Sequence, residues 1–361
     1  MLLSLTLWLT AVCVAFCRLK IQKAGKLVYD ETFSGPLGTV TEDTIFRYYS
    51  QTKILTTAVV MLAAERGLLR LDDPVEMYIP EFADMTVYVG GSVEDDTVET
   101  VLAATPPTVR QCVMHTAGFG YGGLSAPLLE DEVDRIYAAN NLSIMKLIAG
   151  SAGKRYGTLE KLAAKIGTVP LRHQPGTQWD YALGHIVAGR CVEVAMGRTL
   201  TEIMQTEVFD PLGMATAAWG VKANDPTLLP EFGYGTVEQI PGKPWTLKQR
   251  DPVASPPMPG LEAQMGTLLL PDVQMCGRAD DWWKVHFPSR FLSAWCCRVR
   301  YYANPSLDCI DIVMRQLFAC LSSSGRALTG YQLLAPRSVE LMMTSQLPGG
   351  ALLPDIGARA Y

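Results

Sequence analysis

A serine and a lysine, Ser50 and Lys53, stand three residues apart at the head of an apolar, alanine-rich stretch. Serine becomes a nucleophile when a base takes its proton, and a lysine can be that base if burial keeps its amine neutral. Residues three apart share one face of a helix, so the two side chains can touch. A serine in the first helical turn also exposes its own backbone N–H to a developing oxyanion. The pair therefore indicates acyl transfer, and the alternative is an N-capping serine beside a surface lysine.

The same spacing occurs twice more, at Ser143 with Lys146 and at Ser151 with Lys154. Serine and lysine are common, so about one chance match is expected in a chain of this length. We expect the first rival inside an ordinary amphipathic helix with a solvated lysine, and the second in a glycine-flanked loop. Neither context would desolvate an amine, which favours the pair at the head of the apolar stretch.

Other candidate groups are a tyrosine, a histidine and a glycine-rich segment. Tyr181 lies between a Pro-Gly turn and a helix start, where its side chain either projects into a cleft or packs half-buried. His115 precedes the segment GFGYGG, and we expect it to make a structural hydrogen bond.

GFGYGG matches GxGxxG but neither follows a clear strand nor opens a helix, which disfavours a dinucleotide site. It is expected to form a flexible wall of the site, with Gly120 and Tyr121 binding substrate. The remaining histidines show no acidic partner by spacing and are given no role: His173, His185 and His286.

Length and composition bound the class of protein. The chain has 361 residues, of which 48% are hydrophobic and 19% charged, so it is globular and can bury one large core or two moderate ones. The net charge is -5 without a run of Lys or Arg, which gives no electrostatic footprint for nucleic acid. The 9 cysteines show no CxxC pair and no zinc-ligand spacing, so neither a disulfide framework nor a metal site is indicated. The sequence has no GxSxG, HExxH or P-loop motif, which argues against α/β-hydrolases, zinc proteases and NTPases.

The N-terminal segment, residues 1–17, is apolar. Its length suits a signal-peptide core and is short for a membrane span, and no basic residue precedes it. Residues 11–33 can also form a hairpin with Ala24-Gly25 in its turn. We therefore favour a cytoplasmic protein over a secreted or anchored one, and expect membrane association only through this segment.

Hydrophobic periodicity predicts the elements that hold the candidate residues. A helix is expected over about 50–66, ending at Gly67, and the paired acids before Pro74 predict a short capped turn or helix. A tryptophan-containing stretch at 276–305 has no such period and is expected to be an insertion. Other helices are predicted at the start of 107–123, at 128–149 and 158–166, after the Pro-Gly turn at 175–176, from 200 to Pro211, and at 310–321 and 336–347.

Five segments carry a family resemblance through their order along the chain: DTIFRYYSQTK, GLLRLDDPVEMYIPEF, TVRQCVMHTAGFGYG, PGTQWDYALGH and VFDPLGM. The chain resembles the beta-lactamase-related serine hydrolases, which include class C beta-lactamases, DD-carboxypeptidases, family VIII esterases and lovastatin-type acyltransferases. The similarity covers residues 20–214 and resumes over 311–347. It implies an α+β fold in which a helical region packs beside an antiparallel sheet flanked by helices, with the site between them. It implies no metal and no organic cofactor.

The resemblance also implies residue roles. Ser50 would be the acylated nucleophile, Lys53 its proton partner, and Tyr181 a tyrosine that shares the acid–base work. The tyrosine motif reads Tyr-Ala-Leu where beta-lactamases have Tyr-x-Asn, so Leu183 places the chain nearer the esterase and acyltransferase branch. The family's third motif, Lys/His/Trp-x-Gly on a strand, should follow TSQLPGG, but the chain ends at Tyr361, so we expect an incomplete sheet.

These observations predict a single domain at 18–361 that is a serine hydrolase or acyltransferase. Its expected substrate is a small-molecule ester or amide, held through a Ser50 acyl-enzyme. A catalytically inactive domain that keeps the cleft for binding or as a scaffold is the alternative.

Overall fold

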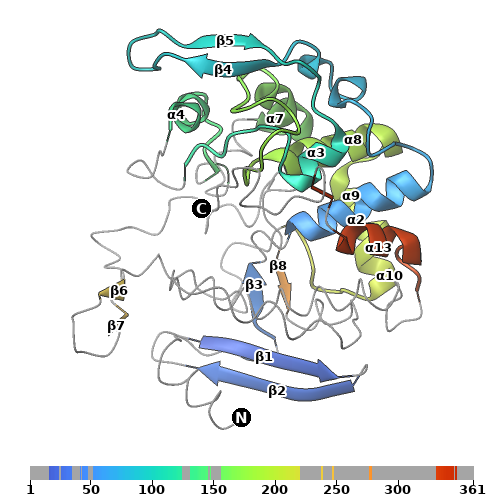
Figure 1. Ribbon diagram of the computed structural model, residues 1–361. Coiled ribbons are helices and arrows are strands. Elements are labelled where there is room, and N and C mark those ends of the chain that lie inside the picture. The colour runs from blue at the N-terminus through green and yellow to red at the C-terminus, as the bar shows by residue number, and fades with distance from the viewer. Residues whose placement is uncertain are drawn as a thin grey trace.

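The computed structural model describes the helical part of the chain, several strands and a segment near the C-terminus (Figure 1). The described residues are 16–23, 26–34, 41, 43–47, 52–123, 131–144, 147, 156–219, 237–238, 246–247, 276–278, 331–344 and 346–347. Helices and antiparallel strand pairs are both present, as the resemblance implies.

The described chain begins with a hairpin of β1 (Phe16–Lys23) and β2 (Lys26–Ser34). The two strands pair antiparallel along their whole length, with one irregularity of register after Ile21. They confirm the predicted hairpin, although Ala24-Gly25 and residues 1–15 lie outside the described part. Within the described ranges, no helix has the length and apolar content that a membrane crossing needs.

Short antiparallel pairs make up the remaining described strands. The pairs are β3 (Ile45–Arg47) with β8 (Cys276–Arg278), β4 (Thr86–Gly90) with β5 (Glu99–Leu102), and β6 (Val237–Glu238) with β7 (Thr246–Leu247). β8 changes one expectation, because the predicted insertion at 276–305 begins with a strand that pairs with β3. The rest of that stretch lies outside the described residues.

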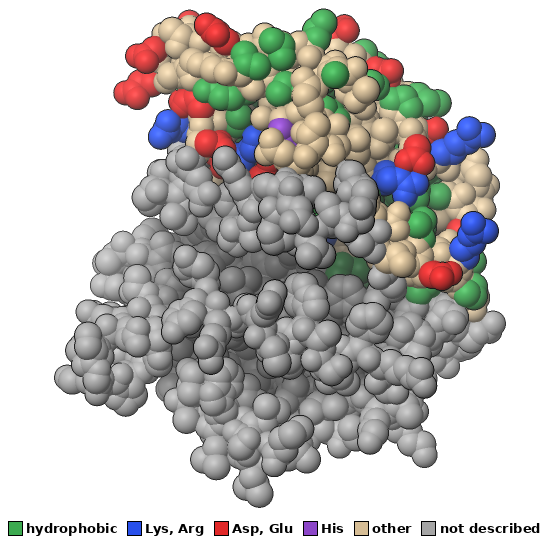
Figure 2. Space-filling model, in the orientation of Figure 1, with side chains coloured by type: hydrophobic (Ala, Val, Ile, Leu, Met, Phe, Trp, Pro, Cys, Tyr) green, Lys and Arg blue, Asp and Glu red, His purple; other side chains and the backbone are tan. Residues whose placement is uncertain are grey.

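The β4–β5 hairpin is joined to the core along β4. The backbone N–H of Tyr88 donates to Leu171 O at 2.8 Å, and Leu171 N–H donates to Thr86 O at 2.7 Å. At the far end of the hairpin, acidic side chains gather on the surface shown in Figure 2. The exposed acids of this tip are Glu94, Asp95, Asp96 and Glu99. The tip is therefore a hydrated surface, whereas β4 anchors the segment that leads to Tyr181.

Helices form the core of the described part. They are α2 (Thr52–Glu65), α3 (Val109–Met114), α4 (Glu132–Ala139), α7 (Leu159–Ile166), α8 (Gly184–Met196), α9 (Leu200–Met204), α10 (Asp210–Leu212) and α13 (Pro336–Met343). 3-10 turns at Val75–Met77 and Pro80–Phe82 fall in the segment where a short capped turn or helix is predicted.

α8 lies at the centre of these helices and contacts α2, α3, α7 and α9. It is buried on more than one side: Ile186, Val187 and Cys191 are all among its buried residues. Burying such an aliphatic side chain contributes about 1.5–3 kcal/mol relative to leaving it in water. The packing of α2 on α8 is what brings the start of α2 close to the turn that precedes α8.

The helices predicted at 50–66, 158–166 and 336–347 are confirmed by α2, α7 and α13. The helix predicted at 310–321 lies outside the described residues.

Two helix predictions differ from the structure at their ends. The helix expected over 128–149 includes α4, which is shorter because the Asp131 side chain caps its start and Asn141 at φ 64° follows its end. The helix expected to close at Pro211 instead passes through it to Leu212, after a π-helical turn at Gln205–Phe209. Proline is tolerated there because it occupies the first turn of α10.

Candidate active site

The lysine of the predicted pair lies in the first turn of α2, which begins at Thr52. Ser50 lies outside the described residues, so its position at the helix start stays a prediction. Lys53 is half-buried, and its Nζ lies 5.0 Å from the centroid of the Tyr181 ring. This distance is within the range of a cation–π contact. The fold therefore brings together two of the three predicted catalytic residues, which are far apart in the sequence.

His115 makes the structural hydrogen bond that its position predicts. Its Nδ1 accepts from the backbone N–H of Ala182 at 3.1 Å, and its carbonyl oxygen accepts from Asp180 N–H at 2.9 Å. The imidazole also lies 4.5 Å from the Tyr181 ring, centroid to centroid. Loss of hydration among these groups, with a further contribution from the positive charge of Lys53, lowers the pKa of His115 to about 3. The ring is therefore neutral at physiological pH.

A second imidazole, His185, is buried, and its ring lies 4.9 Å from that of the half-buried His115. Its Nε2 is 3.1 Å from Thr57 Oγ1, and the Thr57 hydroxyl donates to the carbonyl oxygen of Lys53 at 2.8 Å. Burial, then the neighbouring His115 and Lys53, hold the pKa of His185 well below its ordinary value. Since the hydroxyl hydrogen goes to the carbonyl, His185 must donate from Nε2, which fixes its tautomer.

The glycine segment is close-packed, so the expectation of a flexible wall is wrong for residues 118–123. A Cβ at Gly118 would come within 2.4 Å of His173 O, and one at Gly120 within 2.9 Å of the Tyr137 ring. Tyr121 is only 5% exposed, and its ring lies 5.3 Å from that of Tyr181. Tyr121 thus joins the candidate site, whereas Gly120 has a packing role, and substrate contact by either stays a prediction.

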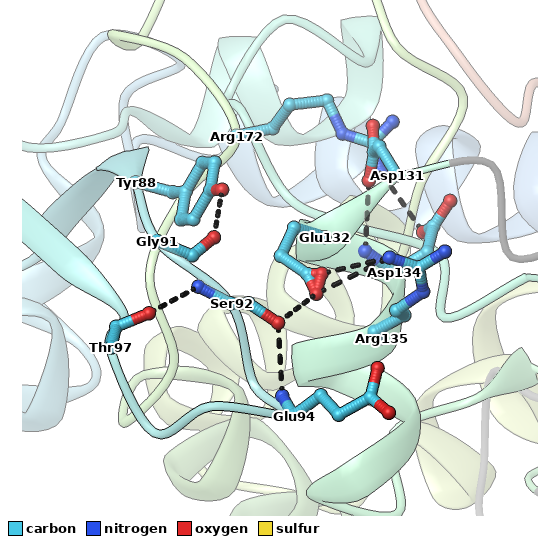
Figure 3. A network of polar contacts seen from close by, with 10 residues as sticks. All are labelled: Tyr88, Gly91, Ser92, Glu94, Thr97, Asp131, Glu132, Asp134, Arg135 and Arg172. Atoms are coloured by element: carbon cyan, nitrogen blue, oxygen red, sulfur yellow. Dashed lines mark hydrogen bonds and ion pairs between the residues drawn. The ribbon is translucent and has the colours of Figure 1, made fainter.

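A buried carboxylate holds the backbone of this segment. Asp134, which is 0% exposed, accepts from the N–H groups of Tyr121 at 3.2 Å and Gly122 at 2.9 Å. Arg172 pairs with Asp134 at 2.9 Å and with Asp131 at 3.2 Å, as Figure 3 shows from close by. Because Asp131 also caps α4, one ion-pair network ties the helix start to the glycine segment.

The same arginine reaches Asp180, the residue before Tyr181. Arg172 Nη1 lies 3.9 Å from Asp180 Oδ1, and His173 Nε2 lies 3.2 Å from Asp180 Oδ2. Sequence spacing gave His173 no acidic partner, because the chain turns back on itself between the two residues. The network therefore holds the backbone of Tyr121 and reaches the residue next to Tyr181.

The rival serine–lysine patterns gain no support. Ser143 is 7% exposed, and its hydroxyl donates to Gly123 O at 3.4 Å. It precedes a helical residue at 144 and does not lie inside an amphipathic helix as expected. Lys146 and the pair Ser151 with Lys154 lie outside the described residues.

Metal-binding side chains do not cluster in threes or more anywhere in the described part of the chain. Cys112 and Cys191 are free thiols buried in the core. Burial raises the pKa of Cys191 to about 12, so this thiol is unreactive.

Comparisons with known proteins identify the family and several relatives of the chain. A family model described as Beta-lactamase matches residues 18–256. Lovastatin esterase of Penicillium rubens is 33% identical over 172 residues, which are 48% of this chain and 39% of that protein. Esterase EstB of Burkholderia gladioli is 30% identical over 173 residues, 48% of this chain and 38% of that protein. The chain thus matches less than half the length of these curated relatives.

Solved structures show the fold. Simvastatin synthase LovD from Aspergillus terreus superposes with a TM-score of 0.58 at 20% identity, covering 96% of this chain and 73% of that chain. A structure described as a putative beta-lactamase from Bacteroides dorei gives a TM-score of 0.52 at 18% identity, covering 97% of this chain and 69% of that chain. Together with the match to the family model over most of the described core, these findings show that the chain belongs to the beta-lactamase family of serine hydrolases.

Proposed function

We propose that this protein is an ester hydrolase or acyltransferase that works through an acyl-enzyme on Ser50. One observation carries the proposal, the contact between Lys53 and Tyr181 beside two neutral imidazoles. An amine and a phenol next to one nucleophile provide the two groups that can accept and return its proton.

In the proposed reaction, Ser50 Oγ attacks the carbonyl carbon of an ester and its proton passes to the Lys53–Tyr181 pair. The tetrahedral intermediate collapses, the alcohol leaves with that proton, and the acyl group stays on Ser50. Water, or a second alcohol, then attacks the acyl carbon while giving a proton to the pair. Collapse of the second intermediate returns this proton to Ser50 and releases an acid or a new ester.

The surroundings support a neutral ester as the substrate. The described rings near Tyr181 are Tyr121, His115 and Trp179, and the histidine is uncharged. Leu183, which stands where penicillin-recognising relatives have an amide, is 2% exposed and offers no polar group to a ligand. Relatives named lovastatin esterase and monacolin J acid methylbutanoyltransferase support an ester of a small acid as the substrate class.

A burst experiment tests the proposal. The purified chain is mixed with 4-nitrophenyl butyrate, and a fluorophosphonate probe is used in parallel with mass spectrometry of the labelled peptide. We expect one equivalent of nitrophenol in the burst and the label on Ser50. Ser50→Ala should remove both signals, because Ser50 is the proposed nucleophile.

Ser143→Ala is the matched control, since Ser143 has the same sequence spacing to a lysine but its hydroxyl donates to the backbone of Gly123. It should keep the burst and the label. A folded wild-type protein without a burst, or labelling that survives in Ser50→Ala, would contradict the proposal and favour the alternative, a catalytically inactive binding domain.

A further inference from the structure

Resting on the proposed function, we infer that His115 is the positioning residue for Tyr181. It holds the peptide groups on both sides of this tyrosine and contacts its ring, and so sets where the phenol hydroxyl stands relative to Lys53. It acts through Tyr181 and does not itself transfer the proton.

The backbone contacts of His115 bracket the tyrosine. Asp180 N–H donates to the carbonyl oxygen of His115 at 2.9 Å, and Ala182 N–H donates to its Nδ1 at 3.1 Å. Both neighbours of Tyr181 are thus hydrogen-bonded to one residue, which restricts rotation of the peptide between them.

The ring contact fixes the side chain as well. The centroids of His115 and Tyr181 are 4.5 Å apart at an interplanar angle of 34°. The other described ring contacts of Tyr181 are longer, at 5.3 Å to Tyr121 and 6.5 Å to Trp179. His115 is therefore the closest aromatic neighbour of the tyrosine in the described part of the chain.

The conformation of His115 makes both backbone contacts possible. It is the residue that ends α3, with φ 62° and ψ 32°. In this left-handed conformation the helix stops, which frees the carbonyl of His115 to accept from Asp180. Asparagine is the side-chain-bearing residue that tolerates this conformation best, which provides a conservative variant.

A row of contacts also connects His115 to α2, the helix that contains Lys53. His115 packs on His185 at 4.9 Å, and His185 is bonded to Thr57, which in turn bonds the carbonyl of Lys53. His115 thus connects Tyr181 to α2 through this row of contacts.

The contact with Ala182 requires an uncharged ring. Nδ1 accepts a hydrogen bond from Ala182 N–H, so the single proton of the neutral ring must be on Nε2. A second proton, on Nδ1, would place one N–H donor against another. The low pKa of His115, about 3, keeps this acceptor available at any pH at which the enzyme would be assayed.

The test uses three variants of the full chain: His115→Ala, His115→Asn and Thr108→Ala. Thr108 caps the opposite end of α3, so its variant weakens the same helix without touching Tyr181. We measure kcat and KM for 4-nitrophenyl butyrate, and the 19F NMR spectrum of 3-fluorotyrosine placed at position 181.

We expect His115→Ala to lower kcat by about 100-fold with KM within about twofold, because misplacement of an acid–base group slows the chemical step and not binding. His115→Asn, which supplies an acceptor and tolerates the left-handed backbone, should recover about tenfold of this loss. Thr108→Ala should keep the wild-type kcat. In the NMR spectrum, His115→Ala should turn one narrow resonance into a broad or multiple one.

An unchanged kcat and an unchanged resonance in folded His115→Ala would overturn the inference, as would an equal loss in Thr108→Ala. Should His115→Ala not fold, His115→Asn decides, because it still lacks the ring and a wild-type kcat would contradict the positioning role. Failure of the proposed function is distinguishable: the wild type would then show no turnover, while the resonance of residue 181 still reports whether His115 holds it.

Discussion

Two neutral imidazoles lie beside Lys53 in the candidate site, and they make the folded protein less stable at acidic pH. The folded protein holds His115 and His185 unprotonated, whereas the unfolded chain protonates both below about pH 6.5. Protons therefore bind the unfolded state preferentially as the pH falls, and stability is lost from about pH 6.5 downward. Above that pH neither histidine affects the pH dependence.

We predict that the free energy of unfolding falls between pH 7 and pH 5 by about 1–2 kcal/mol for each of the two histidines. Urea unfolding at the two pH values measures this difference. The window stops at pH 5 because Glu207, whose pKa is lowered to about 2 chiefly by its hydrogen bond from Arg66, loses its contribution only as the pH falls from about 4.5 toward 2.

The double variant His115→Asn with His185→Gln is the control, because neither new side chain titrates. Its stability should change much less between pH 7 and pH 5. A pH dependence equal to that of the wild type would show that other groups cause the loss.

Sequence reasoning found the residues of the site that have a local signature. Lys53, Tyr181 and the hydrogen-bonding role of His115 follow from a helix start, a turn and a helix end. The pairing of His185 with Thr57 joins residues 128 apart in the chain, and no spacing rule reveals it. Such contacts depend on the packing of α2 against α8, which is a tertiary property.

At the scale of elements, the start of α4 is a junction between three parts of the chain. Asp131 and Asp134 meet Arg172 from the segment before Tyr181, while Ser92 of the β4–β5 hairpin donates to Glu132 at 3.3 Å (Figure 3). The Asp134 and Arg172 side chains are 0% and 7% exposed. A buried charge that loses its partner is costly, so breaking this junction should destabilise the fold.

We predict that Asp134→Ala lowers the free energy of unfolding by about 3–5 kcal/mol, because it leaves Arg172 partly unpaired and two backbone N–H groups without an acceptor. Chemical denaturation measures this change. Arg135→Ala is the control: its ion pair with Glu132 is 54% exposed on the arginine side, and its loss should cost less than about 1 kcal/mol. Equal losses in the two variants would contradict the proposed junction.

Elements with a regular pattern of buried and exposed residues could be predicted from the sequence, and elements without one could not. α2 and α7 are capped or stopped by recognisable residues and carry apolar residues at helical spacing, so their ranges were predictable. β5 is exposed along its whole length and shows no alternation of buried and exposed residues, so no pattern indicated the β4–β5 hairpin. The π-helical turn before Pro211 adds a residue to one helical turn, which periodicity of 3.6 does not anticipate.

At the scale of the whole molecule, residues from near the C-terminus complete the core of the helical region. Leu334 is 1% exposed and belongs to the same buried cluster as the residues of α2. The backbone N–H of Ala335 donates to Glu65 Oε1 at 2.7 Å, which fixes the start of α13 to the end of α2. The described part of the chain therefore has one core that joins distant segments, and that connection was not evident from the sequence.

We predict that Leu334→Ala lowers the free energy of unfolding by about 2–5 kcal/mol in a single transition followed by both fluorescence and circular dichroism. Leu68→Ala is the matched control, since Leu68 is 45% exposed and should cost less than about 1 kcal/mol. Two separate transitions in the wild type, or equal costs for the two leucines, would show that the segment from Tyr331 to Met343 does not share the core.

The close packing of the glycine segment has a practical consequence for changing substrate preference by directed evolution. A mutant library that diversifies Gly118, Gly120 or Gly122 would consist mainly of misfolded members, because each position faces a different neighbouring segment with no room for a methyl group. Trp179 and Tyr121, which contact Tyr181 through their side chains, are better positions to randomise. The GxGxxG pattern here marks residues to keep fixed.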